Sequence, residues 1–186
     1  LVHDDGNSQD TLQARINGYL QLNGNKYPAQ AIHRIDYETS GLVLFCKHPF
    51  FQAYCDKNME EHHIKKDYIA LVQGHTNYKN KKIISNIARD RHNAKKMIIH
   101  PNGKESISIF NTLKNYKDYS LIQVTILTGR KHQIRVQCAS LNHPILNDSL
   151  YGGKKIDNTG LLLQSHHIQF NDIDIICPQE KRFIRK

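Results

Sequence analysis

The strongest constraint on the fold is a pair of strand-like segments joined by a short polar turn. Residues 106–113 and 121–127 alternate loosely between apolar and polar side chains, and the turn lies around residues 115–118. Two such segments with so short a connection predict a β-hairpin, in which the strands run antiparallel. The pattern therefore favours a mixed α+β domain over a repeat of βαβ units.

Hydrophobic spacing predicts the remaining elements. The first helix begins after Asp10, which resembles the start of a capping box with Gln13, and it ends at Asn23-Gly24. Apolar side chains recur at helical spacing over residues 12–20, 50–59 and 130–141. Short apolar runs predict strands at residues 41–45, at 68–72, and from 161 toward 170. We expect one α+β domain over residues 1–186, with a mixed, mainly antiparallel β-sheet flanked by helices and loops.

The charge balance predicts an anionic partner. The 186 residues include 26 Lys and Arg against 17 Asp and Glu, which gives a formal net charge of +9. A folded domain with this excess attracts polyanions such as nucleic acids. A basic surface that serves only solubility is the alternative, and charge by itself leaves both open.

Other features bear on the compartment. No apolar run is long enough for a transmembrane helix, so we expect no membrane partner. The four cysteines form no C-x-x-C pair, which favours reduced thiols and a cytoplasmic protein. The chain begins at Leu1 and not at methionine, so we expect that an upstream segment is missing.

The first candidate functional segment surrounds Asp36. His33-Arg34-Ile35-Asp36 precedes a turn at residues 39–41 and then a predicted strand. An aspartate just before such a turn is exposed and yet held by a rigid element, which suits a nucleophile or a base. The alternative is that Asp36 pairs with Arg34 or accepts hydrogen bonds from turn amides, as most turn aspartates do.

The second candidate segment, residues 128–135, begins a predicted helix directly after a strand. A glycine turn followed by cations at a helix start is typical of phosphate binding or carboxylate pairing, which makes Arg130 a candidate contact. If Arg135 turns inward beside Ile134, it needs an anion, because an unpaired buried charge is very costly. Asp36 is the obvious anion. A surface helix with scattered cations is the alternative.

In order and separation, these segments resemble the motifs of the RluA-like family of RNA pseudouridine synthases. Residues 33–42 resemble its catalytic motif, and residues 66–72 resemble its tyrosine motif. Residues 128–136, together with 143–145 and 148–152, resemble its third motif. The resemblance covers nearly the whole chain in register. The chain departs from the usual family residues at Tyr37, Lys131, Gln137, Asn147 and Ser149.

The resemblance implies a fold and a reaction. The fold is a single pseudouridine-synthase-type catalytic domain, and the reaction converts specific uridines of ribosomal or transfer RNA to pseudouridine. The target base would be flipped out of its stack, and neither a cofactor nor a metal would be needed. The family's first motif and any S4-type RNA-binding domain would lie upstream of Leu1. No obligatory protein partner is implied, and we expect a monomer.

The resemblance also implies a catalytic role for three residues. Asp36 would be the catalytic carboxylate, and Arg135 would pair with it and keep it ionised. Tyr68 would stack on the target uracil and is a candidate for removing the proton from carbon five. The proton role needs a shifted environment, because a free tyrosine has a pKa of about 10.

Substrate contacts follow from the same match. Ile134 or Val136 would form the apolar floor of the site, and Arg34 would fill the gap left by the flipped base. A phosphate contact or a structural ion pair is the alternative for Arg34. The basic stretch 79–104 would contact RNA phosphates through Arg89, Arg91, Lys95 and Lys96. Four more cations could extend that face: Lys47, Lys65, Lys66 and Arg130.

Two other classes of function compete with this hypothesis. An RNA-binding module or RNA chaperone without catalysis explains the charge but not the joint presence of Asp36, Tyr68 and Arg135. A metal-dependent nuclease would need clustered ligands. The twelve histidines show no H-x-x-x-H spacing with a nearby glutamate, which argues against a metal site.

Overall fold

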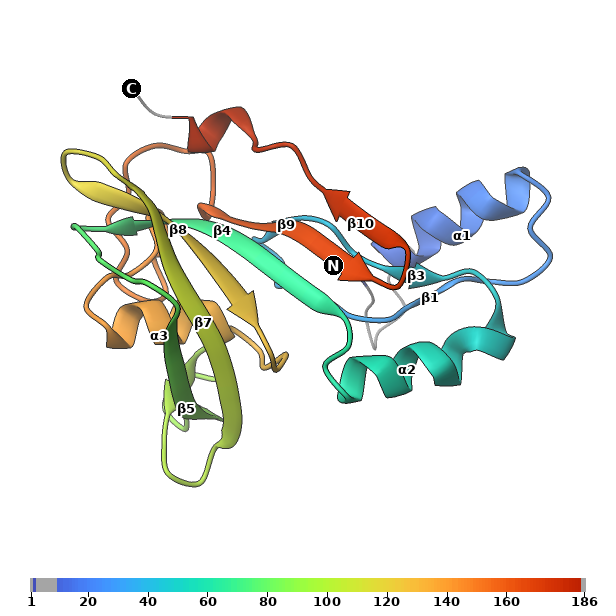
Figure 1. Ribbon diagram of the computed structural model, residues 1–186, viewed down its shortest axis with the longest axis horizontal. Coiled ribbons are helices and arrows are strands. Elements are labelled where there is room, and N and C mark those ends of the chain that lie inside the picture. The colour runs from blue at the N-terminus through green and yellow to red at the C-terminus, as the bar shows by residue number, and fades with distance from the viewer. Residues whose placement is uncertain (1, 3–9, 185–186) are drawn as a thin grey trace.

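The computed structural model describes residues 2 and 10–184 and is built around a mainly antiparallel β-sheet (Figure 1). Across the sheet, the strand order is β10 (Ile173–Ile176), β9 (Leu163–Phe170), β4 (Lys65–Gln73), β8 (Tyr119–Ile126), β7 (Lys104–Asn115), β5 (Lys81–Arg89) and β6 (Met97–Ile99). The short strand β2 (Ser40–Gly41) pairs with β9 in parallel, so the sheet is mixed. The predicted α+β class is confirmed.

The predicted hairpin is formed by β7 and β8. Their antiparallel register runs from Asn115 opposite Ser120 to Ser108 opposite Ile126, with one irregularity between Thr112 and Lys114. β8 also pairs along its length with β4, so β4 lies in the interior of the sheet. This position explains why the apolar run at residues 68–72 is buried on both of its faces.

Within the described residues, three α-helices border the sheet: α1 (Leu12–Leu22), α2 (Gln52–Glu60), which follows the 3₁₀ turn η1 (Pro49–Phe51), and α3 (Gln133–Ser140). α1 and α2 gather at one end of the molecule, and α3 lies at the other end (Figure 1). The predicted cap of α1 is wrong by one residue. Thr11 has extended backbone angles and accepts the Ala14 N–H at 3.1 Å, whereas Asp10 pairs with Arg15 at 2.6 Å.

The apolar run at residues 41–45 is not the single buried strand that its composition predicts. It is divided between β2 and β3 (Phe45–Cys46), and β3 pairs with β1 (Gln30–Ala31) in a separate ribbon. The break occurs at Gly41, whose φ of 103° strains any residue with a side chain. A Cβ at Gly41 would also overlap the backbone carbonyl of Ser165 on β9.

The main core gathers apolar side chains of β4, β7 and β8 together with Ile134 and Cys138 of α3. Leu71, Phe110 and Ile122 are fully buried in it, as is Phe183 from the C-terminal 3₁₀ turn η2 (Lys181–Phe183). The end of the described chain therefore packs back onto the centre of the sheet.

No helix within the described residues is long and apolar enough to cross a membrane.

Candidate active site

Asp36 lies in a loop that is fixed to the sheet on its downstream side. The loop follows β1 and turns at residues 36–39, where the Thr39 N–H donates to the Asp36 carbonyl at 3.0 Å. The chain then enters β2, where Ser40 and Gly41 pair with Gln164 and Ser165 of β9. The Asp36 side chain is therefore held only four residues from a strand of the sheet.

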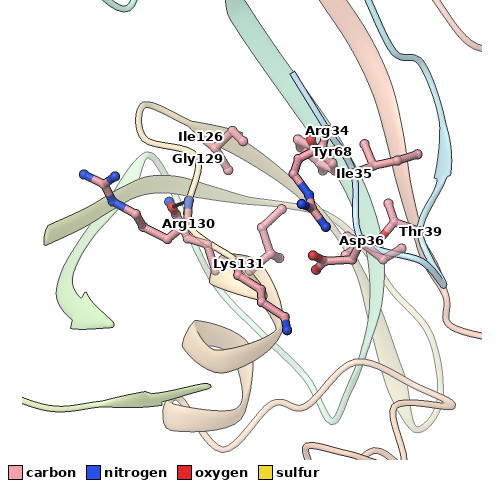
Figure 2. A pocket seen from close by; sticks show the side chains of 12 residues that line it. Arg34, Ile35, Asp36, Thr39, Tyr68, Ile126, Gly129, Arg130 and Lys131 are labelled. Carbon is pink, nitrogen blue, oxygen red and sulfur yellow. Dashed lines mark hydrogen bonds between the residues drawn. The ribbon is translucent and has the colours of Figure 1, made fainter. Parts of the chain in front are cut away.

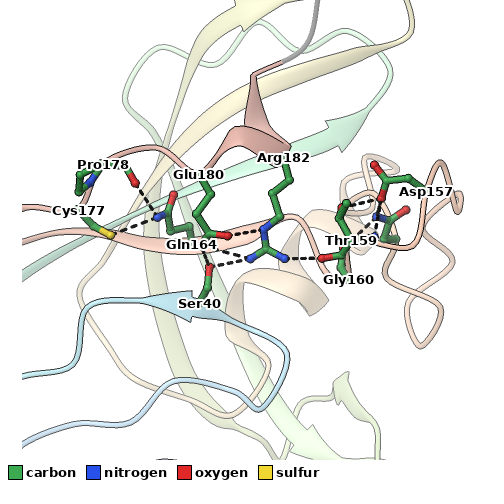
Figure 3. Close-up of polar contacts among 10 residues, drawn as sticks. Ser40, Asp157, Thr159, Gly160, Gln164, Cys177, Pro178, Glu180 and Arg182 are labelled. Carbon is green, nitrogen blue, oxygen red and sulfur yellow. Dashed lines mark hydrogen bonds and ion pairs between the residues drawn. The ribbon is translucent and has the colours of Figure 1, made fainter.

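The C-terminal segment reinforces this attachment (Figure 3). Ser40 Oγ donates to the Glu180 carboxylate and accepts from Arg182 Nη2 at 2.7 Å. Arg182 also donates to the Thr159 carbonyl at 2.8 Å and forms an ion pair with Glu180 at 2.8 Å. A single guanidinium thus joins the loop of Asp36 to two segments that lie far away in the sequence.

Tyr68 reaches the same site from the centre of the sheet. It lies in β4, is 5% exposed, and packs in the main core. Burial and, to a smaller extent, the negative charge of Asp36 raise the pKa of Tyr68 to about 12. The phenol is therefore protonated at neutral pH.

A cavity of about 260 Å³ brings the two predicted motif residues together (Figure 2). Its wall includes Asp36, Tyr68 and the apolar side chain of Ile134. Figure 2 shows the Arg34 guanidinium turned toward the Asp36 carboxylate, whereas Arg130 extends away from it. The remaining lining residues are Ile35, Thr39, Ile126, Gly129, Lys131, Gln133 and Leu163.

The Asp36 carboxylate forms neither of the local contacts that are the alternative to a functional role. Within the described part of the chain, it accepts no hydrogen bond from its own turn amides and has no ion pair with Arg34 within 4.0 Å. Burial raises the pKa of Asp36, while the charge of Arg135, the backbone N–H of His132 and the charges of Arg34 and Lys131 lower it. The carboxylate is thus partly desolvated but surrounded by positive potential.

Arg135 turns inward, but the prediction that it pairs directly with Asp36 is wrong. Its side chain is 3% exposed and forms a bidentate pair with Asp148, at 2.8 Å and 2.7 Å, and a second contact with Glu38 at 3.1 Å. Burial by itself would lower the pKa of Arg135, but the hydrogen bonds and charge of Asp148 raise it. The anion that Arg135 requires is therefore Asp148, and Arg135 acts on Asp36 through its charge from a greater distance.

Val136 does not reach the cavity. It packs with Ile87 and Tyr151 in a small apolar cluster, because residues two apart on a helix point to different sides. Of the two residues predicted for the apolar floor, Ile134 lines the cavity and Val136 does not.

The predicted phosphate-binding residues lie on a neighbouring groove and its surroundings. A hollow of about 470 Å³ shares Gly129, Arg130 and Lys131 with the cavity of Asp36 and Tyr68 and continues to Arg89 and Lys104. Arg91 and Lys95 are exposed, and the Lys96 ammonium lies 5.5 Å from the centre of the Tyr151 ring.

Tyr151 and Asp148 are site residues to which the sequence analysis assigned no role. The Tyr151 hydroxyl accepts the Met97 N–H at 2.8 Å and contacts His132 Nδ1 at 2.8 Å, and Arg135 lies 5.2 Å from its ring centre. Both residues belong to the stretch 148–152 of the third motif, which was the available signal. Across residues 2 and 10–184, no three His, Cys, Asp or Glu side chains are grouped so that they could hold a metal ion.

Comparisons with known proteins point to one family. A sequence model described as RNA pseudouridylate synthase matches residues 1–140. The chain is 37% identical over 153 residues to the uncharacterized RNA pseudouridine synthase YhcT of Bacillus subtilis, covering 81% of the chain and 50% of that protein. It is 40% identical over 135 residues to ribosomal large subunit pseudouridine synthase C of Buchnera aphidicola, covering 72% of the chain and 42% of that protein.

The fold is also similar to that of a solved structure. Human RNA pseudouridylate synthase domain containing 1 superposes with a TM-score of 0.78 at 24% identity, over 95% of this chain and 77% of that one. The chain spans about half the length of the curated relatives described above.

Proposed function

The chain belongs to the family of RNA pseudouridylate synthases, and from that premise we propose that it converts specific uridines in RNA to pseudouridine. The observation that carries the proposal is the shared cavity of Asp36 and Tyr68, which come from separate motifs. The reaction breaks the bond between uracil N1 and the ribose and forms a bond between uracil C5 and the same ribose carbon. C5 loses a proton and N1 gains one.

Asp36 is the catalytic carboxylate of this proposal. It can attack the ribose, remove a ribose proton or add to the base, and each of these routes starts from the ionised form. Burial alone would favour the neutral acid, so the positive potential from Arg135, the His132 amide and Arg34 is what supports ionisation. Because the pKa of Asp36 is raised, activity should fall with decreasing pH at a higher pH than for an exposed aspartate.

Tyr68 supports the base by stacking. Its phenol stays protonated at neutral pH because its pKa is about 12, which makes it a poor base for the C5 proton. Ile134, on the same cavity wall, provides an apolar surface for the uracil ring.

Arg34 and Arg135 carry different tasks. Arg34 is exposed and directed toward Asp36, a position from which it can occupy the gap left by the flipped base (Figure 2). Arg135 is a positioning residue, held by Asp148 and Glu38, that contributes charge to the Asp36 environment.

Ribosomal or transfer RNA is the proposed substrate. The name of one relative, ribosomal large subunit pseudouridine synthase C, favours the ribosomal RNA. The groove lined by Arg89, Lys104 and Arg130 offers a basic path for the backbone beyond the cavity. We propose a cytoplasmic monomer that needs neither a cofactor nor an obligatory protein partner.

Tritium release from RNA containing uridine labelled at carbon five tests this proposal. Wild-type protein should release tritium, and Asp36→Asn should lose the activity by several orders of magnitude while it keeps its fold and RNA affinity. Asp56→Asn, which removes a carboxylate bonded to Gln52 on α2, should leave the rate unchanged. Retained release by Asp36→Asn would overturn the assignment of Asp36. RNA binding by the wild type without release would instead indicate a non-catalytic binding module.

A further inference from the structure

A second hollow adjoins the catalytic cavity on the side of β4. Its volume is about 540 Å³, and its wall shares Arg34, Tyr68 and Arg130 with the catalytic cavity. Its separate part includes the end of α2, Glu105 of β7 and one buried cation of β4, Lys66. Tyr68 thus belongs to both walls, so a nucleotide stacked on it can extend into either hollow.

Lys66 is buried, and no anionic side chain of the described residues pairs with it. The residue is 6% exposed, and its ammonium contacts the Met59 sulfur at 2.9 Å. Among the described residues, no carboxylate lies within 4.0 Å of this ammonium. A thioether is a weak acceptor and carries no charge, so it cannot replace a counterion. A buried charge in this state is costly to keep unless a ligand supplies the anion.

The neighbouring acidic residue is not available to Lys66. Side chains alternate along a strand, so Asp67 points to the opposite face of β4 from Lys66 and Tyr68. There Asp67 accepts from Thr125, contacts His167 Nδ1 at 2.8 Å and pairs with Lys65 at 3.3 Å. On one face of β4, Lys65 therefore has an anionic partner in Asp67. On the other face, Lys66 lines the hollow.

The charges around the hollow favour an anion. Arg34 and Arg130 are cationic, and burial together with the charge of Lys66 lowers the pKa of His33 to about 4, which keeps its imidazole neutral. Burial lowers the pKa of Lys66 to about 8, so at neutral pH it is still mostly charged. The titratable and charged groups on this wall are His33, Arg34, Glu60, His62, Lys66, Tyr68, Glu105 and Arg130.

We propose that the Lys66 ammonium binds a backbone phosphate of the RNA next to the target uridine. The proposal rests on the proposed function, because it takes the position of the uracil from Tyr68. Residues two apart on one strand face are about 7 Å apart, a separation that the base and phosphate of one nucleotide can span. Lys66 would thus hold the backbone while Tyr68 holds the base.

The test measures the affinity for a fluorescently labelled ten-nucleotide oligouridylate, with every protein carrying Asp36→Asn so that no turnover occurs. Lys66→Met should weaken binding about tenfold to a hundredfold, the range for a charge-assisted hydrogen bond. In a plot of log affinity against log salt concentration, the slope of the variant should be less steep by about 0.7, the value for one phosphate contact on a single strand. Lys114→Met is the control, because it removes the same charge from an exposed position of the same sheet that lies outside both hollows, and it should leave both quantities nearly unchanged.

A pH series separates a phosphate contact from a packing effect. Between pH 7 and pH 9 the parent should lose affinity as the ammonium loses its proton, whereas Lys66→Arg stays charged and should keep its affinity across this range. Equal affinities and salt slopes for the parent and Lys66→Met, including an absence of binding by both, would overturn the proposal. That outcome would leave tritium release by the wild type intact, so this proposal can fail while the proposed function holds.

Discussion

Two buried cations near the cavity of Asp36 and Tyr68 have opposite surroundings. Arg135 on α3 is 3% exposed and is held by Asp148 and Glu38. Lys66 on β4 is 6% exposed, and the contact of its ammonium is the sulfur of Met59. The first cation has its anions within the protein and stabilises the fold around the loop of Asp36. The second lines a hollow and has no carboxylate within 4.0 Å in the described part of the chain, which is the arrangement expected for a group that pairs with a ligand.

The largest effect is expected from breaking the paired cation. Arg135→Met leaves the fully buried Asp148 carboxylate without its partner, which should lower the free energy of unfolding by about 3–5 kcal/mol. Urea unfolding at pH 7 measures the change. Arg130→Met, which removes a guanidinium from the exposed surface of the same segment, should change the stability by less than about 0.5 kcal/mol. Similar values for the two variants would remove the distinction between a structural and a surface arginine.

The unpaired cation should respond in the opposite direction. Lowering the pKa of Lys66 from 10.5 to about 8 corresponds to a cost on the order of 3 kcal/mol, so Lys66→Met should be more stable than wild type at pH 7 by roughly 1–3 kcal/mol. Between pH 8 and pH 10.5 the unfolded chain binds more protons than the folded one. The stability of the wild type should therefore rise with pH relative to the variant, and the difference should shrink. Urea unfolding of both proteins from pH 7 to pH 10 measures this, and a variant that is less stable at every pH would contradict it.

The smallest effect on stability is expected at His167, a third cationic group, which lies near the surface. It lies between Asp67 and Asp174, at 2.8 Å from each, and its hydrogen bond to Asp67 raises its pKa. Its contribution is fully present below pH 6.5 and is lost as pH rises through the raised pKa. His167→Gln should therefore lower the stability by less than about 1 kcal/mol at pH 5.5 and have little effect at pH 9. Thermal unfolding at the two pH values measures this, and a larger loss at pH 9 would show that the charge is not what matters.

Local sequence patterns predicted where strands and helices lie better than they predicted which distant segments pack against them. The alternation in residues 106–113 and 121–127 identified β7 and β8, because a hairpin is set by neighbouring residues. The run at residues 41–45 was misread as one strand, because the break at Gly41 depends on the approach of Ser165 from β9, far along the chain. The place of Phe183 in the core likewise follows from tertiary packing that no local spacing reports.

The candidate site shows the same division. The motif resemblance singled out Asp36 and Tyr68, and the structure brings them to one cavity. The requirement that an inward Arg135 must have an anion was correct, but the choice of Asp36 over Asp148 was not, because spacing on one helix does not say which distant carboxylate lies opposite. The sequence could not predict that the Lys66 ammonium contacts a thioether and no carboxylate of the described residues, because tertiary packing decides which side chains lie near it.

The pKa of the Lys66 ammonium, measured by NMR of protein with ¹³C-labelled lysine side chains, tests the contrast between the two cations most directly. The free protein should show a lysine that titrates near pH 8 and is absent from the spectrum of Lys66→Met. Addition of oligouridylate should raise this pKa, because a bound phosphate favours the charged form. A Lys66 that titrates near 10.5 with and without the RNA would contradict the account.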